Sequence, residues 1–179
     1  MLLDSNTKFG TISKLLHWLS ALVIFALFGV GFWMVDLNYY SEWYRTAPHW
    51  HKSIGIILLA FTLVRIGWKV ITVSPKPVST HSPKTRVATK LGHTALYGIL
   101  LIILTSGYLI STADGRAIAV FDWFEVASLG ELIANQEDIA GSIHQYAAYS
   151  LMAIVGIHIL AALKHHFFDK DDTLRRMIK

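Results

Sequence analysis

The chain has 179 residues, of which 54% are hydrophobic and only 16% are charged, whereas soluble domains typically carry about 25% charged residues. The mean hydropathy of +0.47 also favours a membrane protein over a water-soluble one. The absence of cysteine excludes disulfides, thiolate-bound iron–sulfur clusters and haem attached through thioether bonds. The length suits a single domain over residues 1–179.

Four apolar stretches follow one another along the chain. They cover residues 15–35, 51–73, 91–112 and 143–168. A helix of about 20 residues crosses the apolar core of a bilayer, and a backbone in lipid must satisfy its own hydrogen bonds. The sequence therefore predicts an all-α fold, a transmembrane four-helix bundle.

The segments between these stretches differ in composition. Residues 36–50 are rich in Trp and Tyr, which is typical of a membrane interface. Residues 74–90 are basic and hold three of the four prolines. Residues 114–141 form a long acidic connection, in which we expect a short interfacial helix near 129–136.

The basic residues are distributed unevenly between the two sides of the predicted bundle. Thirteen of the sixteen Lys and Arg fall on the side that holds both termini and residues 74–90, and only Arg45, Lys52 and Arg116 fall on the other. The positive-inside rule therefore predicts that both termini are cytoplasmic. This topology is enough to explain the basic face, which would lie against membrane lipid. We therefore expect membrane lipid as a partner and no nucleic-acid partner.

Four histidines lie at two matching depths. His51 and His144 begin their stretches at the outer side, whereas His17 and His158 lie nearer the cytoplasm. His144 and His158 are fourteen residues apart, which places them on one helix face about 21 Å apart along the axis. Each pair could bind one haem iron between two helices, and an iron with two axial imidazoles suits electron transfer.

Two other interpretations of these histidines remain open at this point. A histidine in a membrane helix can be a hydrogen-bonded packing residue or an interfacial group. Transport of haem, zinc or copper is a second alternative, weakened by the absence of cysteine and of acidic residues within the apolar stretches.

The positions of the remaining histidines and of Arg65 indicate a function less clearly. We expect His49 to be interfacial and His81 to be solvated in its loop, while His93 begins the third stretch and His165 and His166 end the fourth. The last three could bond a haem propionate or a quinone carbonyl, or anchor the helices at the interface. Arg65 lies fourteen residues after His51 and either pairs with a propionate of the inner haem or is a positive-inside anchor.

Several short motifs carry a resemblance to a known family. They are Leu16-His17-Trp18, His51-Lys52-Ser53-Ile54-Gly55, Leu91-Gly92-His93 and the tail over residues 164–177. With His144 and His158, they resemble the bacterial cytochrome b561 family of four-helix dihaem membrane cytochromes, over nearly the whole chain. The resemblance implies an inner-membrane protein with two b haems on His17, His51, His144 and His158.

Within this family the chain resembles the superoxide oxidases. That resemblance implies that superoxide gives one electron to the outer haem, and that the inner haem passes it to ubiquinone near the cytoplasmic side. It also implies that His165 and Lys76 lie near the quinone, with Lys84 as a rival to Lys76. The outer side has few cations to attract an anion, and Lys52 beside His51 is the first candidate. The alternative function is an electron-carrier subunit that links the quinone pool to a periplasmic redox partner such as a hydrogenase.

Overall fold

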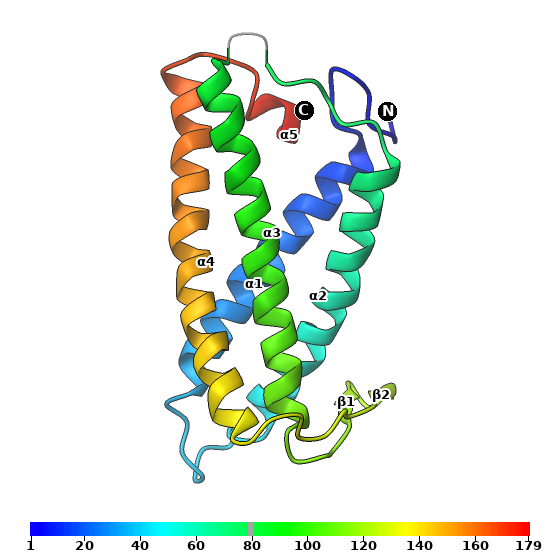
Figure 1. The fold of residues 1–179 in the computed structure, drawn as a ribbon, viewed down its shortest axis with the longest axis vertical. Helices are drawn as coiled ribbons and strands as arrows, with labels where there is room; N and C mark the ends of the chain where they lie inside the picture. Colours follow the sequence, from blue (N-terminus) through cyan, green and yellow to red (C-terminus); the bar gives the residue numbers. More distant parts are fainter. Residues whose placement is uncertain (79–80) are drawn as a thin grey trace.

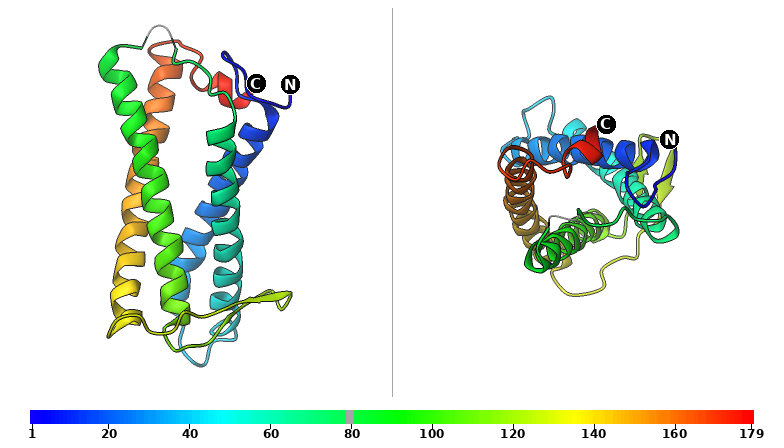
Figure 2. Two further views of the ribbon diagram at one scale, coloured as in Figure 1. Left: turned by 45° about the vertical axis from the view of Figure 1, so that its right-hand side comes forward. Right: turned by 90° about the horizontal axis from the view of Figure 1, so that it is seen from above.

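Four long helices form a bundle in the computed structural model, which describes residues 1–78 and 81–179 (Figures 1 and 2). They are α1 (Thr11–Met34), α2 (Thr46–Ile71), α3 (Pro83–Thr112) and α4 (Gln136–Phe167). Each is long and apolar enough to cross a membrane. The predicted transmembrane four-helix fold is thus confirmed, with the small additions α5 (Arg175–Ile178), β1 (Ile118–Val120) and β2 (Phe124–Val126).

The helices begin earlier than the apolar stretches that they contain. At α3, the Ser82 hydroxyl accepts a hydrogen bond from the backbone N–H of Thr85 at 3.2 Å, and Pro83 occupies the first turn. At α4, acidic residues lie in the first turn and basic residues in the last, as the helix dipole favours. His93 therefore lies well inside α3, and the expectation that it begins the helix was wrong.

A small leucine cluster forms the core halfway along the bundle. Leu58 of α2, Leu100 and Leu104 of α3, and Leu151 of α4 are buried together. Most other large apolar side chains are exposed, as expected where lipid replaces water as the solvent. Leu151 is halfway between His144 and His158 in the sequence, so the cluster separates the two histidine depths.

Both ends of the chain lie at the same end of the bundle (Figure 1). The C-terminal tail packs across this end, where the Trp18 indole N–H donates to the carbonyl of Met177 at 2.9 Å. Arg176 donates to the carbonyl of Lys76 at 2.8 Å. The tail therefore joins the start of α1 to the segment that follows α2.

The long acidic connection at the other end forms a β-hairpin. β1 and β2 pair antiparallel, with Ile118 opposite Val126. The alternation of buried Ile118 and Val120 with the less buried residue between them follows the period of a strand. Residues 129–135 contain no helix, so the expected interfacial helix near 129–136 was wrong. Asn135 directly precedes α4 in the left-handed conformation, with φ 58°, so α4 begins only after it.

The hairpin is attached to the first turns of α2. The buried hydroxyl of Ser53 donates to the carbonyl of Ala119 at 3.4 Å and accepts from the N–H of Phe121 at 3.1 Å. Trp50 packs edge-on against Phe121, with ring centroids 5.6 Å apart. The hairpin therefore covers the part of α2 that carries His49 and His51.

Candidate functional site

His51 of α2 and His144 of α4 face each other at the hairpin end of the bundle. Their ring centroids are 6.2 Å apart and their planes meet at 69°. Two imidazole nitrogens bound at about 2 Å on opposite sides of one metal ion place the ring centroids about 6 Å apart. The separation therefore fits one metal ion held by both rings.

Two glycines provide the space in which these rings lie. A Cβ added to Gly31 of α1 would be 3.1 Å from Cε1 of His51, and one added to Gly107 of α3 would be 3.1 Å from Cε1 of His144. Both distances are tighter than ordinary packing. Sequence reasoning missed these two glycines, and the signal available was a glycine on each flanking helix at the depth of a candidate ligand.

The proton positions on this pair suit metal binding. Nδ1 of His144 is 2.9 Å from the carbonyl oxygen of Ile103, which can only accept, so Nδ1 carries the proton. Nε2 of His144 is then unprotonated and available as a ligand. Nδ1 of His51 is buried without a hydrogen-bond partner among the described residues, an arrangement that costs free energy unless a bound group relieves it.

A second group of imidazoles lies at the end that holds the termini. The ring centroids of His17 (α1) and His158 (α4) are 6.4 Å apart, with planes at 64°. His93 of α3 is closer to His158, with centroids 5.5 Å apart. That distance is shorter than the span of about 6 Å between two rings bound on opposite sides of one metal ion. His17 therefore fits better than His93 as the partner of His158.

Arg65 is brought directly to His17. Its Nη2 lies 2.9 Å from Nδ1 of His17, and the guanidinium carbon lies 5.3 Å from the centre of the Tyr97 ring. A guanidinium can only donate, so Nδ1 accepts and Nε2 of His17 carries the proton. This is the opposite arrangement from His144, and a metal ion at Nε2 requires Arg65 to take another acceptor.

His165 is placed among charged residues at the end of α4. Its Nδ1 lies 2.9 Å from Oδ2 of Asp169 and 3.1 Å from Oδ2 of Asp171. His81 joins the same cluster, since its Nε2 is 2.9 Å from Oδ2 of Asp171 and its side chain is only 10% exposed. The expectation that His81 is solvated was wrong, because the C-terminal tail folds back and brings Asp171 to it.

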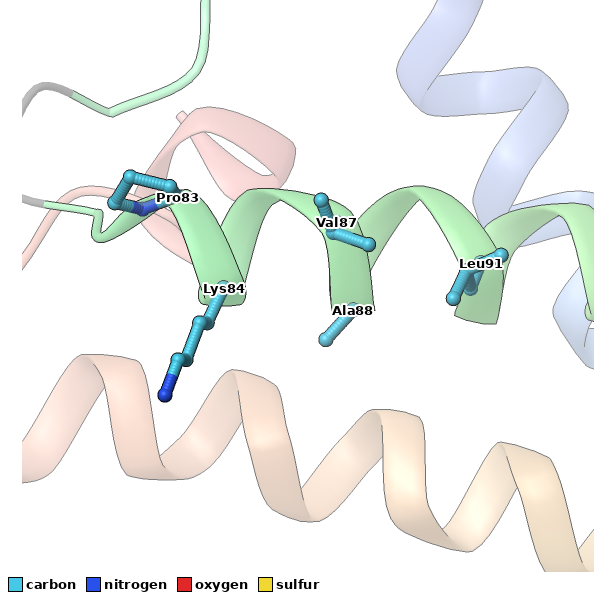
Figure 3. Close-up of a pocket in the computed structure, with 5 residues that line it drawn as sticks. All are labelled: Pro83, Lys84, Val87, Ala88 and Leu91. Atoms are coloured by element: carbon cyan, nitrogen blue, oxygen red, sulfur yellow. The ribbon is translucent and has the colours of Figure 1, made fainter.

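The two candidate lysines are placed differently at this end. No hydrogen bond or ion pair joins Lys76 to His165 in the described part of the chain, and the backbone of Lys76 is tied to Asn6 and Arg176 instead. Lys84 lines an open apolar depression of about 410 Å³ at the start of α3 (Figure 3). The other lining residues are Pro83, Val87, Ala88 and Leu91. Lys84 is thus the lysine that lies beside an apolar surface.

A second, smaller pocket of about 200 Å³ lies at the hairpin end. It is lined by His49, Lys52, Ser111, Asp114, Arg116 and residues 117–119. Lys52 and Arg116, two of the three basic residues at this end, therefore lie with His49 around one pocket. Arg116 hydrogen bonds to Asp114 through Nε at 2.6 Å, and this bond lowers the pKa of the Asp114 carboxyl.

Comparison with known proteins agrees with this architecture. Residues 8–179 match the family described as prokaryotic cytochrome b561. The chain is 48% identical over 175 residues to cytochrome b561 homolog 2 of Escherichia coli (strain K12), covering 98% of this chain and 93% of that protein. It is 26% identical over 174 residues to the probable superoxide oxidase CybB of Yersinia pestis, covering 97% of each.

Members of this family are membrane proteins that bind b haems and transfer electrons. The four membrane-length helices agree with that description, and the half-buried imidazoles between them are suited to a haem iron. The chain therefore belongs to the prokaryotic cytochrome b561 family, as a multi-pass electron-transfer protein of the bacterial inner membrane.

Proposed function

We propose that this chain is a dihaem cytochrome that oxidises superoxide at the periplasmic end and reduces ubiquinone at the cytoplasmic end. His51 and His144 would hold the outer haem, and His17 and His158 the inner one. The separations of 6.2 Å and 6.4 Å within these two pairs carry the dihaem arrangement, and the similarity to a probable superoxide oxidase supports the choice of superoxide. When bound, the haems would supply one-electron transfer between the two membrane surfaces.

The orientation follows from charge. The end that holds both termini carries thirteen of the sixteen Lys and Arg, so this end is cytoplasmic by the positive-inside rule. The hairpin end is then periplasmic. The whole chain acts as the single domain expected from its length, because both proposed haem pairs use α4, which spans the bundle.

At the outer end, the residues of the chain position the ligands and attract the anion. The carbonyl of Ile103 holds the proton of His144 on Nδ1, so that Nε2 is ready for the iron. Lys52 lies in a pocket whose other charged residues, Arg116 and Asp114, pair with each other, so Lys52 gives this otherwise acidic side a local positive charge that attracts superoxide. Each superoxide loses one electron there and leaves as oxygen.

At the inner end, Arg65 has two partners in turn. With an iron on Nε2, His17 would carry its ring proton on Nδ1 and would no longer accept from Arg65. The guanidinium would turn to a carboxylate, and a haem propionate is the acceptor that such a group prefers. Arg65 thereby becomes both a positioning residue and a positive charge beside the inner haem.

The quinone site lies at the cytoplasmic end of α3 and α4 in this proposal. His165 and Lys84 are the residues that support it, since Lys84 borders an apolar depression at the start of α3 and His165 lies in the last turn of α4. Lys76 is kept as the rival lysine. Two electrons from two superoxide anions, with two protons from the cytoplasm, convert one ubiquinone to ubiquinol.

The test is rapid mixing of superoxide with oxidised protein that contains haem and ubiquinone. The absorbance of reduced b haem should rise much faster in the wild type than in His144→Ala, which lacks the outer haem. Lys52→Ala should slow the reaction and weaken its dependence on salt. A wild-type rate equal to that of His144→Ala would overturn the superoxide reaction.

The second candidate function is an electron-carrier subunit for a periplasmic redox partner, such as a hydrogenase. The observation in its favour is the hairpin, in which 75% of Trp123 and 51% of Phe124 are exposed. Aromatic side chains of this kind are enriched in protein interfaces. A protein that contains both haems and does not react with superoxide, but is reduced by a periplasmic protein, would favour this function.

A further inference from the structure

We propose that His81, His165 and Asp171 form a binding site for a divalent zinc ion at the cytoplasmic end of the bundle. The three residues come from the segment before α3, the end of α4 and the C-terminal tail. The site is separate from both proposed haem pairs. The proposal goes beyond electron transfer and does not depend on haem, although it uses His165, which the proposed function places at the quinone site.

The ligand atoms already have the spacing of a metal site. One ligand atom from each residue lies within 4.8 Å of the others. Oδ2 of Asp171 is 2.9 Å from Nε2 of His81 and 3.1 Å from Nδ1 of His165. Ligand atoms at about 2.0–2.2 Å around a tetrahedral zinc are about 3.3 Å apart, so the two distances to Asp171 are already close to those of a zinc site.

His165 gives a second and independent indication. Its Nδ1 is buried and lacks a hydrogen bond among the described residues, although Oδ2 of Asp169 is only 2.9 Å away. The nitrogen is therefore close to two carboxylate oxygens, of Asp169 and Asp171, without the geometry to bond either. A cation between these atoms would satisfy all of them.

The charge state of Asp171 also suits a metal ligand. Its side chain is only 3% exposed, and burial alone would raise its pKa. Hydrogen bonds from Thr173 and His81 outweigh burial and hold the pKa of Asp171 at about 2. The carboxylate is thus ionised at neutral pH, as a metal ligand must be.

The donor set favours zinc over calcium and magnesium. Two imidazoles and one carboxylate match a known zinc ligand set, with the fourth position open to water or to Asp169. Calcium and magnesium prefer oxygen ligands only. The rival explanation is a metal-free cluster in which Asp171 simply accepts a hydrogen bond from His81.

The first experiment measures zinc binding to the purified full-length protein in detergent. After treatment with a chelator, the protein is titrated with zinc alone, and the bound metal is counted against protein by mass spectrometry and calorimetry. We expect one zinc per chain, and His81→Ala and Asp171→Asn should each weaken binding at least about tenfold. His49→Ala, a histidine at the opposite end, is the matched control and should bind as the wild type does.

The second experiment guards against variants that fail to fold. The chain has no cysteine, so Ile178→Cys in α5 accepts a single spin label without other changes. Zinc should reduce the mobility of this label in the otherwise unchanged chain. The bound ion would join Asp171 of the C-terminal tail to His165 of α4 and so restrain α5, which follows Asp171. Equal zinc binding by the wild type, His81→Ala and Asp171→Asn, or a label that zinc does not affect, would overturn the proposal.

Discussion

The two histidine pairs differ in how they are held before any cofactor binds. At the outer end, Gly31 and Gly107 make room for the rings of His51 and His144, and the carbonyl of Ile103 fixes a proton on His144. At the inner end, His17 bonds to Arg65, and His158 has a second imidazole, His93, at 5.5 Å. The spacing within the pairs is nearly the same, whereas the surroundings are not.

This difference indicates a division of roles along the bundle. The outer pair is preorganised, because helix backbones and a carbonyl determine where its rings lie. The inner pair must exchange a hydrogen bond when it binds a metal ion. If the inner haem binds there as proposed, Arg65 is the charged group that would adjust its redox potential.

Removal of one ligand from either end should produce the largest effect. We expect His144→Ala to lose the outer haem and His17→Ala to lose the inner one, so that the haem content falls by about half in each. The pyridine haemochrome assay against protein concentration measures this. The two variants should retain different haems, distinguishable by their midpoint potentials.

His93→Ala is the control for the inner pair. Because the distance of 5.5 Å between the rings of His93 and His158 is too short for two axial ligands, this variant should keep both haems. Loss of haem from His93→Ala together with full haem content in His17→Ala would show that His93 is the partner of His158.

A side chain at Gly107, where the ring of His144 lies against the backbone, should weaken the outer site without removing a ligand. A Cβ at residue 107 would lie 3.1 Å from Cε1 of His144, so Gly107→Val should displace the ring at a cost of about 1–3 kcal/mol. We expect partial loss of the outer haem and an altered low-spin signal in electron paramagnetic resonance. Gly67→Ala is the control, since a Cβ there meets nothing within 4 Å. An equal loss of outer haem in both variants would contradict the claim that Gly107 makes room for His144.

The sequence predicts the helices well because the requirements of the bilayer are strong and local. About 20 apolar residues in a row specify a spanning helix whatever its neighbours are. The depths of His17, His51, His144 and His158 follow from their positions along these stretches. The spacing of fourteen residues also places His144 and His158 on one helix face. These features need no knowledge of how the helices pack.

The features that the sequence did not predict depend on long-range contacts. His81 is buried by Asp171, ninety residues later, and Ser53 of α2 holds Phe121 of a hairpin. Gly31 and Gly107 matter only because helices α1 and α3 lie beside His51 and His144. No local pattern distinguishes such residues from ordinary loop or packing residues.

Loss of the Arg65 charge should lower the potential of the inner haem alone. A positive charge beside a haem favours its reduced form, so Arg65→Met should shift the inner midpoint down by roughly 40–100 mV, about 1–2 kcal/mol for one electron. A redox titration followed by absorbance resolves the two midpoints. Arg45→Met at the other end is the control. A larger shift of the outer haem than of the inner haem in Arg65→Met would contradict the placement of Arg65.

Acid should release the C-terminal tail from the inner end, as the smallest of these effects. Burial alone raises the pKa of Asp171, yet the bonds from Thr173 and His81 lower it to about 2 from an ordinary value of 3.8. A lowered pKa stabilises the docked tail above about pH 4, and this contribution is lost as the pH falls through 2. A spin label on Ile178→Cys should therefore become more mobile between pH 4 and pH 2. In Asp171→Asn, which cannot ionise at this position, the label should be mobile already at neutral pH and change little over that interval.

Asp114 at the outer end also has a lowered pKa, but through an exposed bond to Arg116. Asp114→Asn should therefore leave the acid response of the label unchanged, because that pair is at the opposite end of the bundle.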